Sequence, residues 1–192
     1  MTGNKPNFTN IDVLRCFLRL DKNISRQELS RQLKLGEGTV RTILGLLKSK
    51  KLLQSTKKGH FLSKLGLLEL SRLHDNVENP KIIAAKSIYP EYHNMGVLLK
   101  KSEALKQAYK LRDIAVKNHA EGALILKFQN KLFAPESGYK GNFTDIEKHF
   151  EFKNGNILII AFAQDFKDAE VGALAIAAEL NRQLGNFIKK FE

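Results

Sequence analysis

The stretch that decides the fold of the first part of the chain is residues 25–63, SRQELSRQLKLGEGTVRTILGLLKSKKLLQSTKKGHFLS. Ser25 is followed three residues later by Glu28, the spacing of a capping box, which predicts a helix through Leu33. The residues 33–36 predict a tight turn before a third helix. Two short runs then flank Lys57-Lys58-Gly59, and they predict a two-stranded hairpin because glycine tolerates the backbone of such a turn.

Outside this stretch, a second capping box at residues 9–12 predicts an earlier helix, and leucines at helical spacing predict a later one over 64–73. The order of helices, turn and hairpin predicts a winged helix-turn-helix. Such a domain would place the third helix, which precedes the hairpin, in the DNA major groove. In that helix, apolar side chains share one face, and the opposite face carries Thr39, Arg41, Thr42, Gly45 and Lys48. Glycine inside a helix costs about 1 kcal/mol relative to alanine. We therefore expect a close approach at Gly45, and we favour helix packing over DNA approach as its cause.

The charge is unevenly distributed along the 192 residues, whose formal net charge is +12. Residues 1–75 contain 15 lysine and arginine residues against 6 acidic ones, and the rest of the chain contains 17 against 14. A basic domain attracts polyanions through counterion release, so nucleic acid is the expected partner. Charge alone leaves a solvated basic surface as an equal alternative.

Several classes of protein are not expected. The single cysteine, Cys16, excludes an internal disulfide framework and the common zinc patterns, and its apolar helical context predicts a buried, unreactive thiol. There is no signal-like segment and no apolar run near the roughly 20 residues that span a bilayer, so we expect a cytoplasmic protein without a membrane partner. No cofactor or metal is expected.

A polar segment over 75–80, ending in proline, is the candidate boundary between a first domain, 1–75, and a second, 81–192. The second domain mixes strands and helices, which predicts a two-layer α/β sandwich and an α+β protein overall. The expected strands cover 81–88, 95–100, 122–128, 131–133 and 157–163. The expected helices cover 102–119, 143–150 and 168–186.

The predicted interface with double-stranded DNA has two classes of residue. The first turns of the third helix would contact base edges, through Glu37, Thr39, Arg41 and Thr42. The ends of the helices and the hairpin tip would contact phosphates, through Arg26, Arg31, Lys48, Lys50, Lys51, Lys57, Lys58 and His60.

Residues 10–73 resemble the winged helix-turn-helix domains of prokaryotic transcription regulators, including the Leu-Ser-Lys-Leu-Gly at 62–66 that follows the hairpin. The whole chain resembles an archaeal family of uncharacterised two-domain proteins. The short motifs that carry this second resemblance are Leu-Arg-Asp at 111–113, Ala-Glu-Gly-Ala at 120–123, Ala-Pro-Glu-Ser-Gly at 134–138 and Asp-Ala-Glu at 168–170. The resemblance implies a second domain related in fold to the small inserted domain of some aspartyl-tRNA synthetases and amidotransferases. It implies no activity, and this chain departs from the expected Phe-Pro-Glu by having Phe-Ala-Pro-Glu at 133–136.

A candidate ligand site in the second domain would comprise Arg112, Asp113, Glu121 and Glu136, if the helix and two loops meet at one end of the sheet. We favour a local surface network of the first three residues over such a site. The histidines are scattered without metal-ligand spacing, and there is no G-x-S-x-G or phosphate-binding loop, so no enzyme activity is expected.

The resulting hypothesis is a DNA-binding transcription regulator whose second domain serves dimerisation or the sensing of a small-molecule effector. A homodimer is expected because pairing two half-site readers gives the longer operator that specificity needs. Leu65, Leu68 and Leu73, or the helical stretch 173–184, would supply the interface, although both are favoured as core. The alternatives are a protein- or RNA-interaction module, and a ligand-binding protein or enzyme with an accessory winged helix.

Overall fold

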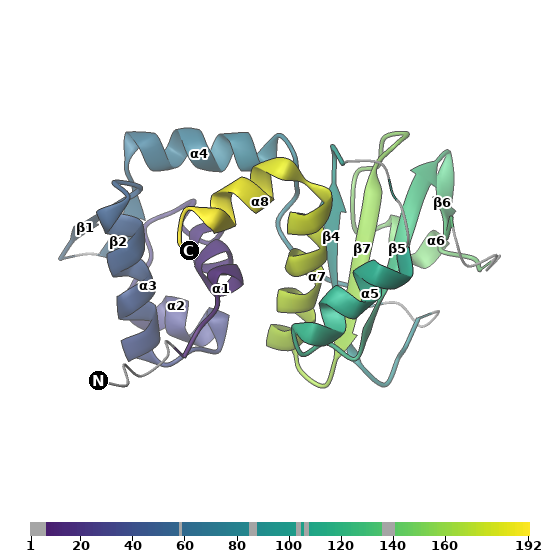
Figure 1. Ribbon diagram of the computed structural model, residues 1–192, viewed down its shortest axis with the longest axis horizontal. Helices are drawn as coiled ribbons and strands as arrows, with labels where there is room; N and C mark the ends of the chain where they lie inside the picture. The colour runs from purple at the N-terminus through teal and green to yellow at the C-terminus, as the bar shows by residue number, and fades with distance from the viewer. Residues whose placement is uncertain (1–6, 58, 85–87, 103–104, 106–107, 136–140) are drawn as a thin grey trace. The chain divides into compact units, whose positions relative to one another are not determined.

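The computed structural model describes residues 7–57, 59–84, 88–102, 105, 108–135 and 141–192. The chain forms two compact units, which are shown in Figure 1. Unit 1 comprises the residues up to Leu73 together with Asn186–Glu192, and unit 2 comprises His74–Gly185. Unit 1 is mainly helical and unit 2 contains a five-stranded sheet, so the predicted α+β class with two domains is confirmed.

Unit 1 begins with three helices, α1 (Asn10–Phe17), α2 (Arg26–Leu33) and α3 (Glu37–Ser49). A hairpin of β1 (Leu53–Thr56) and β2 (Gly59–Leu62) and the helix α4 (Lys64–His74) follow. Thr9 and Asp12 form the predicted capping box of α1. Ser25 caps α2 by accepting a hydrogen bond from the backbone N–H of Glu28, but the Glu28 carboxylate accepts from Gln32 instead of closing the box.

An ion pair lies in the core of unit 1. The Arg15 guanidinium donates to the Asp12 carboxylate at 2.8 Å and to the Leu33 carbonyl at 3.1 Å, and both charged side chains are at least 95% buried. The pair therefore joins the start of α1 to the end of α2. Cys16 beside it is buried, which confirms the predicted burial of this cysteine, and burial raises the pKa of its thiol to about 12.

Two glycines fix how the hairpin joins the helices. Gly59 has φ +138°, and a Cβ there would lie 2.8 Å from the Ile24 carbonyl oxygen, because Ile24 and His60 form a β-bridge. Gly66 has no room for a Cβ, which would lie 2.1 Å from the carbonyl oxygen of Leu52. Ser63 precedes it and accepts a hydrogen bond from the Gly66 N–H. The Leu-Ser-Lys-Leu-Gly motif is thus a helix cap followed by a close backbone contact.

The helix predicted over 168–186 is wrong in one respect, because it is broken into α7 (Phe166–Leu180) and α8 (Arg182–Lys189). The buried Asn181 between them is extended, and its side-chain oxygen accepts from the N–H groups of Gln183 and Leu184. Beyond the break the chain enters unit 1, where the fully buried Phe187 ring packs 4.7 Å from that of Phe17. The predicted second domain extends to residue 192, whereas unit 2 ends at Gly185.

The sheet of unit 2 is antiparallel throughout, with the order β3–β4–β7–β5–β6. Its strands are β3 (Lys81–Ile82), β4 (His93–Leu99), β5 (Gly122–Gln129), β6 (Lys131–Phe133) and β7 (Ile157–Ala163). The strand predicted over 81–88 ends at Ile82, because residues 83–84 are not in the strand, and residues 85–87 lie outside the described residues. All seven residues of β7 are buried, as expected for the central strand.

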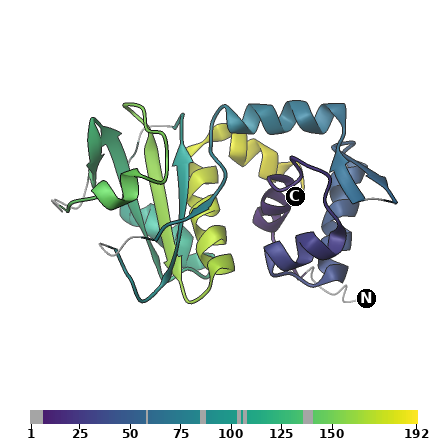
Figure 2. The same ribbon diagram turned by 180° about the vertical axis from the view of Figure 1, so that it is seen from behind.

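One face of this sheet is covered by α5 (Ala108–Lys117) and α7, as Figures 1 and 2 show. The helix predicted over 102–119 is described only from Ala108 to Lys117. The opposite face carries an apolar cluster that includes Leu98, Leu126 and Phe150, next to the short helix α6 (Thr144–Glu147). In the described part of the chain, no helix is both long and apolar enough to cross a membrane.

Candidate nucleic-acid interface

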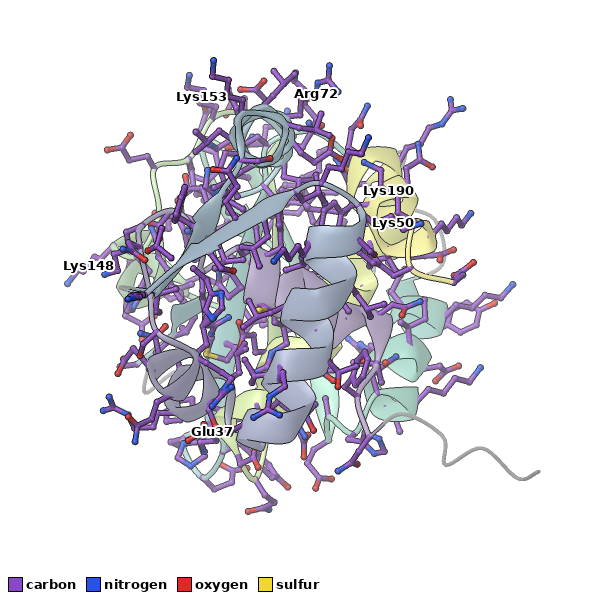
Figure 3. All side chains as sticks on the ribbon, turned by 90° about the vertical axis from the view of Figure 1, so that its left-hand side faces the viewer. Glu37, Lys50, Arg72, Lys148, Lys153 and Lys190 are labelled. Atoms are coloured by element: carbon purple, nitrogen blue, oxygen red, sulfur yellow. The ribbon has the colours of Figure 1, made fainter. Side chains whose placement is uncertain are left out.

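The exposed face of α3 is the centre of the candidate interface. Val40, Ile43, Leu44 and Leu47 are buried on the inner side of the helix, and this periodicity leaves the rest of it facing outward. Figure 3 shows Glu37 at one end of α3 and Lys50 at the other. Exposed side chains or Cα atoms along this face belong to Glu37, Gly38, Arg41, Thr42, Gly45, Lys48 and Ser49.

Gly45 lies on this exposed face, and a Cβ built on it meets no described atom within 4 Å. The same is true of Gly38, two turns earlier on the helix. Packing against another described helix therefore does not explain Gly45, and our preference for that explanation is wrong. The two glycines have no side chain and that of Thr42 is short, so the α3 backbone is accessible from outside at these positions.

Three of the predicted contact residues that the structure describes form ion pairs with acidic side chains or with each other. The Arg26 guanidinium donates twice to one Glu37 carboxylate oxygen, at 3.1 and 3.0 Å, and so links the starts of α2 and α3. Arg31 forms an ion pair with Glu28. Arg26 and Glu37 thus have a structural role in holding the two helices, which the sequence pattern did not reveal.

The remaining contact residues differ in their surroundings. Thr39 is half-buried, and the Thr42 hydroxyl donates to the Gly38 carbonyl at 3.2 Å. Among the residues that the structure describes, no ion pair engages the exposed cations Arg41, Lys48, Lys50, Lys51 and Lys57. Lys58 lies outside the described residues.

His60 connects the hairpin to the segment that precedes α2. Its backbone pairs with Ile24, and its Nδ1 lies 2.8 Å from the Ser55 hydroxyl across the hairpin. Burial lowers the pKa of His60, and the positive charges of Arg26 and Lys48 lower it further. Arg26 at the start of α2 and Lys48 in the later part of α3 therefore both act electrostatically on His60 in β2.

Unit 1 also holds most of the excess charge of the protein. With the C-terminal segment included, it carries 17 lysine and arginine residues against 6 acidic ones, and unit 2 carries 15 against 14. The grouping of residues in space therefore concentrates the positive charge more than the division of the sequence at residue 75 does.

The candidate ligand residues in unit 2 do not form the surface network that we favoured. Arg112 and Asp113 are exposed on α5, and Glu121 is exposed just before β5. Within the described ranges, no hydrogen bond or ion pair joins these three side chains. Glu136, the fourth candidate, lies outside the described residues.

The leucines of α4 divide between the core and the surface. Leu73 is buried, but Leu65, Leu67 and Leu68 are 48%, 53% and 50% exposed. The expectation that the stripe Leu65, Leu68 and Leu73 is core is thus wrong for its first two members. The sequence analysis did not select Leu67, because this residue lies outside the stripe of Leu65, Leu68 and Leu73 that helical spacing defines.

Comparisons with known proteins identify two matching segments. Residues 10–67 match the family model described as PH0730-like, N-terminal domain, and residues 90–180 match a domain of unknown function (DUF4443). A solved structure, that of the hypothetical protein PH0730 from Pyrococcus horikoshii OT3, is similar to 94% of this chain and to 100% of its own, with 26% identity and a TM-score of 0.79. No curated protein matches the chain.

These matches support the predicted similarity to an uncharacterised two-domain family with an archaeal member. The two matched segments lie in different units of the structure. Neither the family descriptions nor the name of the similar protein states an activity, so the function has to be argued from the residues of the chain.

Proposed function

We propose that unit 1 is a winged helix-turn-helix that binds double-stranded DNA and that the protein is a transcription regulator. The observation that carries this proposal is the outer face of α3, where exposed cations that pair with no described acidic residue flank an open stretch of backbone. An α-helix fits the DNA major groove, and a face of this kind can approach both phosphates and base edges.

The proposed contacts follow from the pairing seen in unit 1. Arg41 and Thr42 face outward near the middle of α3 and would contact base edges, since arginine can bond bidentately to guanine. Lys48 and Lys50 near the end of the helix, with Lys57 at the hairpin, would contact phosphates. Arg26 and Glu37 would fix the angle between α2 and α3 through their ion pair.

The test is duplex-DNA affinity as a function of salt. The variant Lys48→Ala/Lys57→Ala should lower the affinity for all sequences and reduce the slope of log K against log salt by about 2, because each phosphate contact contributes about 0.9. The matched control is Lys64→Ala/Arg72→Ala on α4, which removes the same charge from unit 1 and should leave the slope unchanged. An equal effect of both variants would mean that α3 and the hairpin have no special role.

Base reading is tested separately with Arg41→Ala. The variant should lose about 1–3 kcal/mol of discrimination at one base position of a selected site. Unchanged discrimination at every position would remove Arg41 from the base-reading set.

We further propose that the DNA-binding form is a homodimer. Three half-exposed leucines on α4 form an apolar surface of the kind that marks an interaction site. Two copies related by a two-fold axis would read two half-sites.

A further inference from the structure

Lysines from distant parts of the sequence gather at one end of the unit 2 sheet. Leu99 at the end of β4 and Lys127 near the end of β5 both lie opposite Ile157, on either side of β7. Lys131 begins β6 opposite Gln129, at the same end. This is the upper end of the sheet in Figure 1. We call it the lysine end, and it comprises Lys100, Lys101, Lys127, Lys131 and Lys153.

The positive charge at this end results from where the fold places the lysines, because unit 2 as a whole has almost equal numbers of basic and acidic residues. The segments 99–102, 127–131 and 152–156 contain all five lysines and no acidic residue, and the acidic residues next to them are Asp75, Glu147 and Glu151. The segments 88–93, 118–122 and 163–168 form the opposite end, with four acidic residues and one lysine. Unit 2 therefore has a positive end and a negative end.

The lysines of this end are accessible. Lys100, Lys101, Lys131 and Lys153 are exposed, and Lys127 is half-buried. Lys100 Nζ donates to the His74 carbonyl oxygen at 2.9 Å. In the part of the chain that the structure describes, none of the five forms an ion pair, although the exposed acids Asp75 and Glu151 border these segments.

Asparagine side chains hold the backbone on which these lysines stand. The buried Asn156 donates to the Lys100 carbonyl at 3.3 Å and accepts from the Lys153 N–H at 2.7 Å. The buried Asn181 donates to the Lys101 carbonyl at 2.7 Å. Asn154 accepts from the N–H of Asn130 at 2.8 Å, which ties together the turns that carry Lys131 and Lys153. Because the backbone is already ordered, less conformational entropy is lost when the lysines bind a partner.

We propose that the lysine end contacts the phosphodiester backbone of the nucleic acid that unit 1 binds, as a second, sequence-independent phosphate site. A cluster of lysines that form no ion pair with any described residue, on an ordered surface, matches a polyanion, and each contact releases counterions. This inference rests on the proposed function of unit 1. It adds the phosphate backbone as a partner of unit 2.

The test uses the full-length protein and a random-sequence duplex of about 30 base pairs, with anisotropy measured from about 50 to 250 mM KCl. In Lys127→Ala/Lys131→Ala/Lys153→Ala, the slope of log K against log salt should fall by about 2–3, since each lost phosphate contact lowers it by about 0.9. The control Arg112→Ala/Lys117→Ala/Lys167→Ala removes the same charge elsewhere in unit 2 and should leave the slope unchanged. If denaturation shows that the first variant is unfolded, Lys131→Ala/Lys153→Ala spares the strand position and should lower the slope by about 2.

The outcomes separate this inference from the proposed function. Equal slopes for the wild type and the lysine-end variant would overturn the inference, while a reduced slope in Lys48→Ala/Lys57→Ala would still support DNA binding by unit 1. A reduced slope in the lysine-end variant alone would show a phosphate site on unit 2, but it would overturn the proposed role of α3 and, with it, the inference that both units bind one nucleic acid. Equal losses in the lysine-end variant and its control would show a general charge effect and also overturn the inference.

Discussion

At the scale of single residues, the glycines of unit 1 have opposite roles. Gly59 and Gly66 are required by close backbone contacts with Ile24 and Leu52. Gly45 meets nothing, so no contact within the described chain compensates for the stability that it takes from α3. Glycine is therefore required by internal packing at Gly59 and Gly66, whereas Gly45 lies on an open surface.

The variant Gly45→Ala should be more stable than the wild type and bind DNA less well. Alanine favours the helix by about 1 kcal/mol over glycine, and the Cβ has free space in the protein. The same methyl group would obstruct a DNA backbone that approaches the helix closely. Chemical denaturation and duplex affinity measured on the same preparation check both parts.

Gly38→Ala, in the first turn of α3 and also with open space, tests a second position of the same face and should likewise lower the duplex affinity. If Gly45→Ala gains stability and binds DNA with wild-type affinity, the DNA does not approach α3 at this position. The proposed docking of α3 would then need a different angle.

At the scale of elements, α4 shows how one helix can serve two surfaces. Its inner side contributes Leu70 and Leu73 to the core, and Gly66 allows it to pack against the base of the hairpin. Its outer side exposes Leu65, Leu67 and Leu68. Such an exposed apolar face on a helix is unfavourable in water unless a partner covers it.

The variant Leu65→Glu/Leu68→Glu should therefore be monomeric under conditions in which the wild type is a dimer. Both side chains are half-exposed, so the free energy of unfolding of the monomer should change little. Sedimentation equilibrium over a range of protein concentrations measures the association. Ser49→Glu, an exposed position on α3 and outside the leucine face of α4, is the control and should leave the dimer intact. A wild type that stays monomeric at all concentrations would contradict the proposed homodimer.

At the scale of the whole molecule, the chain passes from unit 1 to unit 2 and returns at its end. The last residues are part of the structure of unit 1, because Phe187 is fully buried against Phe17 and Lys190 pairs with Glu69. A sequence cut at residue 75 would therefore leave unit 1 without a part of its core.

Removal of the residues after Gly185 should destabilise unit 1. Loss of a buried phenylalanine costs about 3–5 kcal/mol, a large share of the roughly 5–15 kcal/mol that stabilises a typical domain. Phe187→Ala should reproduce most of this loss in the full-length chain, and Phe191→Ala, which is only half-buried, should cost less. Denaturant unfolding measures the difference. Equal stability of the full-length and shortened chains would contradict the assignment of this segment to unit 1.

Local patterns in the sequence were sufficient for most of the helices and for the hairpin of unit 1. Caps such as Thr9 and Ser25 and the turn glycine Gly59 act within a few residues, so their effect is visible in the sequence itself. The outward position of Arg41 and Lys48 follows from helical periodicity in the same way.

The contacts between distant residues were decided only by the tertiary structure. The sequence does not show that Arg26 pairs with Glu37, that Asn181 breaks a helix, or that Phe187 returns to unit 1. The register of the sheet, together with the hydrogen bonds of Asn156, brings Lys100, Lys127 and Lys153 to one end. The sequence by itself determined the elements and the basic character of the first domain, because these depend on local spacing and composition. Which charges are paired and which stay exposed depends on packing between segments far apart in the chain, and only the folded chain decides it.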